Sequence, residues 1–75
     1  MSRMEVSSEV TGKVWKLDAS AGQKIDKGDV LIIVESMKME IPVVSPQAGL
    51  LLELLVTEGE TVEEGQIIAV IEYRS

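Results

Sequence analysis

The fold is decided by a stretch that the chain contains twice, as Glu9–Glu35, EVTGKVWKLDASAGQKIDKGDVLIIVE, and as Pro46–Glu72, PQAGLLLELLVTEGETVEEGQIIAVIE. The two copies align without a gap at a shift of 37 residues. Five of the 27 aligned positions are identical, and three of the five are glycines. Two repeats are too few for a solenoid, so the repeat predicts one domain with internal quasi-twofold symmetry.

Glycines divide each copy into short apolar segments that are typical of β-strands. We expect strands at 13–17, 24–25 and 29–35, at 50–56, 61–62 and 66–72, and at 41–44 between the copies. A helix is disfavoured because Val and Ile dominate and no segment between glycines holds three turns. Pro42 predicts an edge strand or a bulge. The predicted fold class is all-β, a flattened barrel or sandwich, because such closure protects strand edges.

The length of 75 residues predicts a single domain over 1–75 with an ordered core at about 8–73. A chain this short buries only about 60–65% of its unfolded surface, so its stability is marginal without help. It contains no cysteine and no histidine, which excludes disulfides and the commonest metal ligands and general bases. Aliphatic packing must therefore hold the fold, and 45% of the residues are hydrophobic.

Charge and hydropathy exclude several classes of partner. The formal net charge of −6 argues against nucleic acid, which requires basic patches. No apolar run approaches the roughly 18–20 residues of a membrane span, and the first ten residues lack the apolar core of a signal peptide. We therefore expect a cytoplasmic protein with no membrane partner. No cluster of residues suggests a catalytic centre or a metal site.

The two copies are joined by Glu35–Glu40, ESMKME, which is expected to be a hairpin with Met37 and Lys38 at its tip. Tight hairpin turns normally contain Asn-Gly or Asp-Gly, so this turn breaks the local rule, and such departures are often functional. Met37 and Met39 are expected to share a face beside the lysine. Two readings stay open from these residues alone: a recognition feature, or a solvated lysine beside methionines that plug the end of the barrel.

ESMKME closely resembles the biotin attachment motif of biotin-dependent carboxylases, which is commonly Ala-Met-Lys-Met. The family's Pro-x-x-Gly matches Pro46–Gly49, and its glycine-punctuated stretch resembles Glu58–Ile67. The resemblance covers roughly residues 8–72. It implies two four-stranded antiparallel sheets in a flattened barrel with twofold pseudosymmetry, the barrel-sandwich hybrid.

The resemblance also implies a function, that of a biotin carboxyl carrier protein. A biotin protein ligase would recognise Glu35, Met37 and Met39 and join biotin covalently to Lys38. The biotin would carry a carboxyl group between biotin carboxylase and carboxyltransferase subunits that act in trans. The chain itself would be a non-catalytic carrier and a monomer when isolated.

This sequence departs from the family pattern at three places. Glu9 stands where the first half-repeat often has proline. Ser36 stands where alanine is common, and the short connection from Leu17 to Gly22 lacks the protruding thumb of some bacterial acetyl-CoA carboxylase carriers. The chain therefore resembles the thumbless, stand-alone type.

Three other functions compete with the biotin carrier. A lipoyl carrier of a 2-oxoacid dehydrogenase or glycine cleavage system has the same fold, but it usually shows Asp-Lys-Ala where this chain has Met-Lys-Met. An unmodified interaction module would lack the lysine between methionines. An enzyme would need a nucleophile, base or metal cluster that the sequence does not display.

Overall fold

The computed structural model describes residues 1–74, and every regular element in it is a β-strand. The strands are β1 (Ser2–Ser7), β2 (Gly12–Leu17), β3 (Lys24–Ile25), β4 (Val30–Ser36), β5 (Met39–Val44), β6 (Gly49–Leu54), β7 (Thr61–Val62) and β8 (Ile67–Tyr73). The predicted all-β class is confirmed. The seven predicted strands correspond to β2 through β8, with bounds that differ by up to two residues. No helix able to cross a membrane occurs among residues 1–74.

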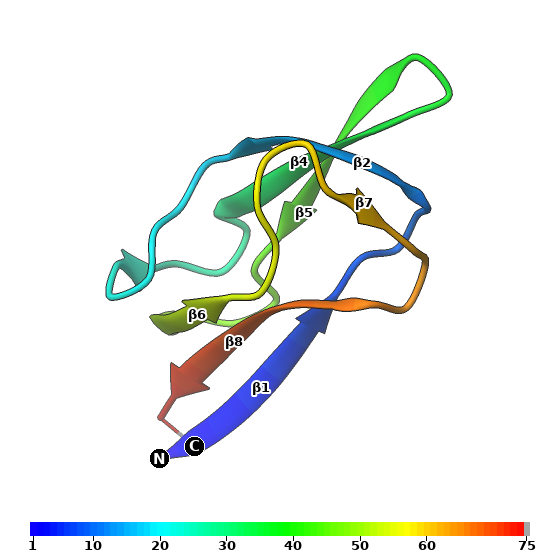
Figure 1. Cartoon of the computed structure of the whole chain (residues 1–75). Coiled ribbons are helices and arrows are strands. Elements are labelled where there is room, and N and C mark those ends of the chain that lie inside the picture. The colour runs from blue at the N-terminus through cyan, green and yellow to red at the C-terminus, as the bar shows by residue number, and fades with distance from the viewer. Residues whose placement is uncertain (75) are drawn as a thin grey trace.

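The strands form two four-stranded sheets, in the orders β1-β8-β6-β3 and β5-β4-β2-β7, and all pairs are antiparallel (Figure 1). β5 is an end strand, as Pro42 predicted. The predicted ordered core begins at about residue 8, and the structure has a further strand before it, β1, which pairs with β8. This strand was missed because Ser2–Ser7 contains only two inward-facing apolar side chains, Met4 and Val6, among polar ones.

The predicted quasi-twofold symmetry is visible in the strand register. Ser2 pairs with Tyr73, and the positions 37 residues away from these two, Met39 and Ser36, pair in the other sheet. The symmetry therefore exchanges the two sheets, and it also exchanges the two ends of the molecule. One end has the β4–β5 hairpin, and the other has the N- and C-termini side by side (Figure 1).

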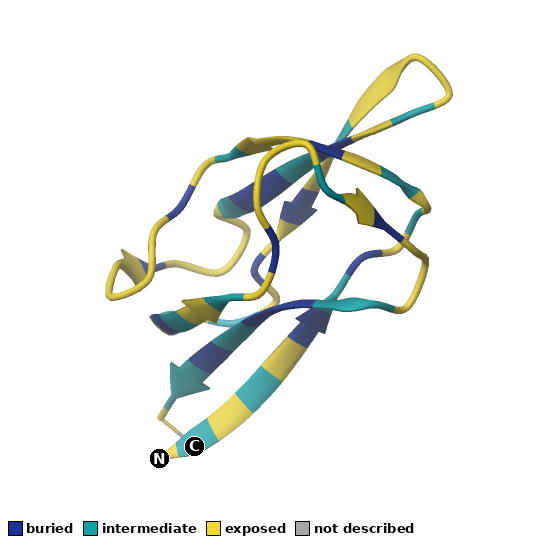
Figure 2. Cartoon of the chain, in the orientation of Figure 1, coloured by how far each residue is buried: buried dark blue, intermediate teal, exposed yellow. Residues whose placement is uncertain are grey.

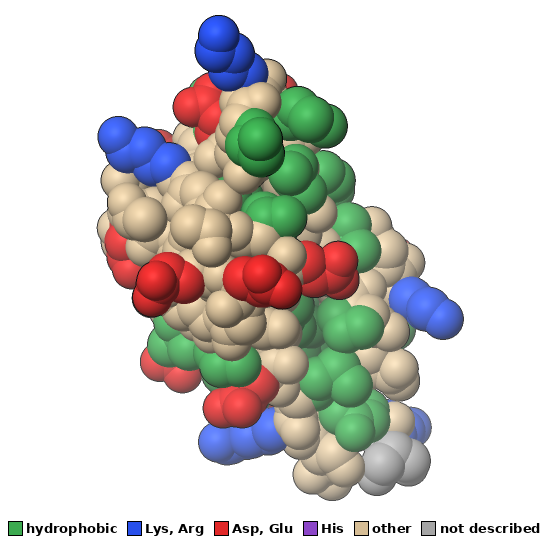
Figure 3. Space-filling model, turned by 90° about the vertical axis from the view of Figure 1, so that its right-hand side faces the viewer, with side chains coloured by type: hydrophobic (Ala, Val, Ile, Leu, Met, Phe, Trp, Pro, Cys, Tyr) green, Lys and Arg blue, Asp and Glu red, His purple; other side chains and the backbone are tan. Residues whose placement is uncertain are grey.

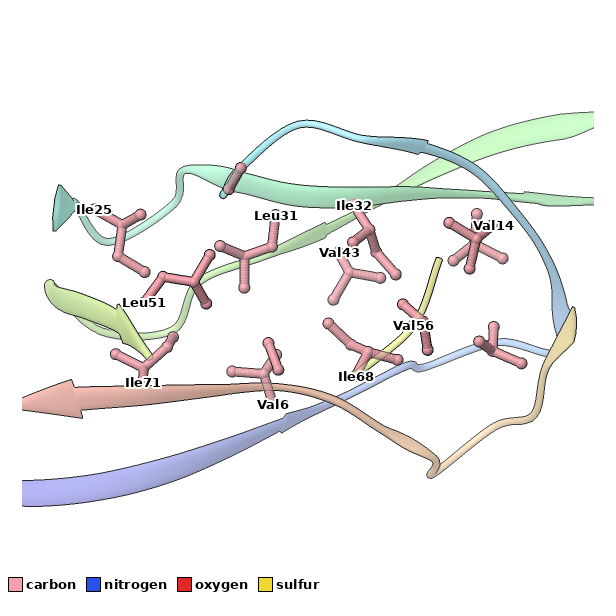
Figure 4. Close-up of a cluster of buried hydrophobic side chains, with 14 residues drawn as sticks. Val6, Val14, Ile25, Leu31, Ile32, Val43, Leu51, Val56, Ile68 and Ile71 are labelled. Carbon is pink, nitrogen blue, oxygen red and sulfur yellow. The ribbon is translucent and has the colours of Figure 1, made fainter. Parts of the chain in front are cut away.

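The space between the sheets is filled by fourteen buried aliphatic side chains that face one another (Figure 4). They form seven pairs related by the 37-residue shift: Val6/Val43, Val14/Leu51, Ala19/Val56, Ile25/Val62, Leu31/Ile68, Ile32/Ala69 and Val34/Ile71. Burying a Val, Leu or Ile side chain stabilises a fold by about 1.5–3 kcal/mol. This shared core is the main stabilising interaction of a chain that has no disulfide.

Two buried serines extend the repeat beyond the residues in which it is recognised by sequence. The Ser8 hydroxyl donates a hydrogen bond to the Val10 carbonyl, and the Ser45 hydroxyl donates one to the Gln47 carbonyl, both at 2.6 Å. Each hydroxyl is buried, and each satisfies its hydrogen-bonding need inside its own loop. The two loops therefore leave β1 and β5 with the same geometry.

Four glycines with φ between 87° and 91° close the turns between strands. In the turn at Glu63, the backbone N–H of Gln66 donates to the Glu63 carbonyl, and the Gln66 side chain accepts from the Glu63 N–H. Positive φ at the third residue is the signature of a type II turn, which glycine adopts without strain. A different constraint acts at Gly49, where an added Cβ would collide with the backbone carbonyl of Glu72 on β8.

These two kinds of glycine predict different costs for the same substitution. Gly59→Ala should lower the free energy of unfolding by about 1–2 kcal/mol, because it adds only backbone strain in open space. Gly49→Ala should lower it further, because the backbone of β8 must move away. Urea unfolding of both variants measures the difference, and an equal or smaller loss for Gly49→Ala would contradict the predicted clash.

Candidate functional site

The β4–β5 hairpin ends in a two-residue turn. Ser36 and Met39 are the last paired residues, which leaves Met37 and Lys38 in the loop with φ values of 51° and 64°. Positive φ at both positions is the requirement of a type I′ turn, which normally contains Asn-Gly. Non-glycine residues in this region cost roughly 1–2 kcal/mol each. The structure thus confirms that the local turn chemistry is unfavourable at this tip.

The tip of the hairpin extends beyond the rest of the molecule and is exposed (Figure 2). Met37 is 91% exposed, Met39 is 62% exposed, and Lys38 between them is exposed as well. Within residues 1–74 the structure contains one ion pair, between Lys16 and Asp18, so it does not involve the hairpin lysine. The amine of Lys38 is therefore free for a partner, beside two flexible apolar side chains.

The end of β4, directly before the turn, is fixed to the body of the molecule. The Ser36 hydroxyl donates a 2.8 Å hydrogen bond to the backbone carbonyl of Thr11. The Thr11 hydroxyl in turn accepts a 3.0 Å hydrogen bond from the backbone N–H of Glu64. These contacts join the end of β4 to two loops, so that the turn is held at a defined place on the body of the molecule. An alanine, common in the family at the position of Ser36, could not make the first of these bonds.

Glu35 lies on the outer face of the hairpin. It is opposite Glu40 on β5 and opposite Lys13 on β2, and all three side chains are exposed. Like charges directly across a strand pair repel, and the lysine on the other side offsets this repulsion. The arrangement leaves a carboxylate beside the hairpin that a partner can contact.

Met39 has a different environment from Met37. It continues the inner-face row of Ile41 and Val43 along β5, because side chains alternate along a strand. Met37 lies in the turn, beyond the last strand pair, so the alternation along the strands does not assign its side chain to a face. The two methionines are therefore presented on different parts of the hairpin.

Several acidic side chains lie on the loops next to the end of β4 and on β5. Glu63 and Glu64, in the turn that binds Thr11, are exposed, as are Glu9 and Glu40. Figure 3 shows a row of acidic side chains below the end from which a basic side chain protrudes. A cluster of three or more His, Asp or Glu residues suited to a metal ion is absent from the part of the chain that the structure describes.

The family model described as "Biotin-requiring enzyme" matches residues 4–71 of this chain. The chain belongs to this biotin/lipoyl attachment family. Members of it are carrier domains for covalently bound biotin or lipoyl groups, and are generally non-catalytic. The resemblance seen in the sequence is thus confirmed at the level of the family.

Two curated relatives have about the same length as this chain. The chain is 43% identical over 65 residues to the biotin/lipoyl attachment protein of Bacillus subtilis, covering 87% of this chain and 89% of that protein. It is 43% identical over 67 residues to the biotinylated protein TB7.3 homolog of Mycobacterium leprae, covering 89% and 94%.

A solved structure confirms the fold and shows it inside a larger protein. The crystal structure of the Kluyveromyces lactis urea carboxylase superimposes with a TM-score of 0.91 at 36% identity. The match covers 96% of this chain but only 6% of that enzyme. A domain of this kind therefore also occurs as a small part of a much longer carboxylase.

The strain in the turn gives a prediction about stability. Replacing the tip with the double variant Met37→Asn, Lys38→Gly should raise the free energy of unfolding by about 1 kcal/mol, because these residues adopt positive φ readily. Lys27→Gly, in another turn and at a position without positive φ, is the matched control and should not stabilise the fold. Thermal and urea unfolding provide the measurement, and an unchanged or lower stability of the double variant would refute the strain.

Proposed function

We propose that Lys38 carries covalently attached biotin and that the chain is the biotin carboxyl carrier protein of a multisubunit carboxylase. The observation that supports this most is the position of Lys38, exposed at a protruding turn between two exposed methionines. Met37 and Lys38 adopt positive φ although neither residue type favours it. Such a departure is expected where a partner must recognise the residues, even at a cost in stability.

Attachment would form an amide bond between the Lys38 amino nitrogen and the carboxyl carbon of biotin. A biotin protein ligase would activate the carboxyl group and deprotonate the ammonium group to the attacking amine. As the C–N bond forms, the activating group would leave and the nitrogen would lose a second proton to the ligase or to solvent. The product loses one positive charge from a chain whose formal net charge is −6. This chain supplies only the acceptor amine, since the chemistry belongs to the ligase.

Recognition by the ligase would involve Glu35, Met37 and Met39. Methionine is flexible and polarizable, so it adapts to a partner's pocket. The carboxylate of Glu35 lies on the outer face of the same hairpin and adds a charged contact. The hydrogen bond from Ser36 to Thr11 attaches the strand end that presents these groups to the body of the molecule.

Once attached, biotin would accept a carboxyl group from a biotin carboxylase subunit and deliver it to a carboxyltransferase subunit. Both subunits would act in trans on the exposed arm of a carrier that is monomeric when isolated. The acidic side chains below the hairpin favour basic surfaces around those active sites, since complementary charge speeds encounter.

A lipoyl carrier is the second candidate, and one observation favours it. The Bacillus subtilis relative is described as an attachment protein for biotin or lipoyl groups. The methionines on both sides of Lys38 favour biotin, because lipoyl domains usually have Asp-Lys-Ala.

Lys38→Arg tests the attachment site. The variant should unfold within about 0.5 kcal/mol of the parent, because the side chain is exposed. It should gain no mass with biotin, biotin ligase and ATP, because arginine stays protonated and cannot attack the activated acyl group. Lys27→Arg is the control and should be biotinylated as the parent is.

Intact mass spectrometry and a melting curve on each protein decide the outcome. One added biotinoyl group on the parent and on Lys27→Arg, but none on Lys38→Arg, is expected. A biotinylated Lys38→Arg protein would disprove the assignment. Modification of the parent by a lipoyl ligase but not by a biotin ligase would replace the first candidate with the second.

The role of the flanking methionines gives a separate prediction. Met37→Ala should slow biotinylation roughly tenfold, which corresponds to about 1.4 kcal/mol of lost recognition. Leu55→Ala removes an apolar side chain that is also exposed but lies outside the hairpin, so it should leave the rate unchanged. Initial rates at limiting carrier concentration provide the comparison, and equal rates for both variants would exclude recognition through Met37.

A further inference from the structure

The two end strands β1 and β5 enclose a groove of about 390 Å³. Apolar residues, among them Val6, Val10, Ile41 and Val43, line it, and so do the polar residues Glu5, Ser7 and Glu9. Its volume falls within the range of roughly 300–1,000 Å³ typical of small-molecule sites. Neither strand has a partner on the side of the groove, because β1 and β5 are the outer strands of their sheets.

Most of the residues that line the groove form pairs related by the quasi-twofold symmetry, but the groove is extended at one end. It includes Ile41 and Val10, but it does not include their equivalents at the other end, Met4 and Gln47. Val10 precedes Thr11, and the Thr11 carbonyl accepts a hydrogen bond from the hydroxyl of Ser36, directly before the turn. The groove therefore extends toward the end of the molecule that carries Lys38.

The inner face of the hairpin connects the groove to the turn. Met39, Ile41 and Val43 follow one another on the same face of β5, from exposed through half-buried to buried. On the view in Figure 3, hydrophobic side chains continue from the protruding end down one face of the molecule. Apolar surface thus leads from beside Lys38 to the core.

We propose that this groove is a resting site for the ring system of the prosthetic group carried on Lys38. The proposal rests on the function proposed above. In this resting site the prosthetic group would contact the carrier's own surface whenever no partner enzyme binds it.

The reach of the arm fits the position of the groove. The lysine side chain and a five-carbon acyl chain together provide roughly eleven covalent bonds of about 1.5 Å, or on the order of 13 Å when extended. Ile41 lies three residues from Lys38, about 10 Å along a strand. The extended arm is therefore long enough to bring the ring to Ile41, which lines the groove, without any change in the backbone.

The chemistry of the groove fits biotin. The fused rings of biotin have an apolar body, which the aliphatic lining of the groove can cover. They also have a ureido edge with two N–H donors. Glu5 and Glu9 lie on the β1 side of the groove, at positions where the symmetry places Pro42 and Pro46 on the β5 side. Carboxylates on one side only can accept hydrogen bonds from the ureido group, while a dithiolane ring has no such donors.

A weak interaction is sufficient because the ring is tethered. Short flexible tethers give effective concentrations on the order of 1 mM, so a dissociation constant of that size would occupy the groove about half of the time. The ring would remain available to a partner, since an occupied fraction near one half reduces its apparent capture only about twofold. The groove would shield the ring from solvent for part of the time and still leave it available to a partner enzyme.

The quasi-twofold symmetry supplies a matched pair of variants for the test. Ile41→Gln places a polar side chain in the groove, and Met4→Gln makes a comparable change at the equivalent position, which is at the other end and outside the groove. Both side chains are half-buried in the parent. Parent and variants are first biotinylated, and one added group per chain is verified by intact mass.

Methyl NMR on the parent, before and after biotinylation, provides the first measurement. We expect nuclear Overhauser effects between the biotin ring protons and the methyl groups of Ile41 and Val10, with shift changes at these residues. Changes confined to Met37–Met39, without such effects, would overturn the resting site. This measurement stands even if Ile41→Gln does not fold.

The rate of streptavidin capture provides the second measurement, because streptavidin binds only the released ring. Ile41→Gln should be captured roughly twofold faster than the parent, and Met4→Gln at the parent rate. Equal rates for all three proteins would overturn the resting site while leaving the biotin carrier intact. A parent that gains no biotin would instead overturn the proposed function on which the resting site rests.

Discussion

The close packing of two equivalent sets of aliphatic side chains is the interaction on which the rest of this structure depends. Each of the seven buried positions of one set has its equivalent in the other, and the two sets face each other between the sheets. A chain of 75 residues without cysteine has few other sources of stability. Each sheet buries its apolar face against the other, so neither is stable alone. The 37-residue repeat makes the two contributions equivalent.

This core makes the unfavourable turn possible. Two residues with positive φ would cost roughly 1–2 kcal/mol each, and an isolated hairpin could not tolerate that. Here β4 pairs with β2 along its length, and Ser36 and Thr11 fix its end. The strain is therefore confined to the tip, where the side chains face solvent and a partner can read them.

The symmetry also explains why one end of the molecule differs from the other. The backbone is the same at both ends, but a two-residue turn closes it at one, and the chain begins and ends at the other. The hairpin and the termini consequently lie at opposite ends (Figure 1). In the urea carboxylase the similar domain is 6% of the chain. A connection made at the end with the termini leaves the hairpin unobstructed.

The sequence predicted the all-β class, the internal repeat and the position of ESMKME at the junction of the copies, because these depend on local patterns of glycine and aliphatic residues. It also indicated a turn of unfavourable residues, since the preference for positive φ is a property of each residue type. That Ser2–Ser7 is an edge strand could not be predicted in this way, because its pairing with β8 joins residues that are far apart in the chain. The Ser36–Thr11 contact and the groove between β1 and β5 likewise arise only when distant segments meet. Such contacts depend on how the two sheets pack against each other. A local sequence pattern does not indicate which distant segments will be neighbours in the fold.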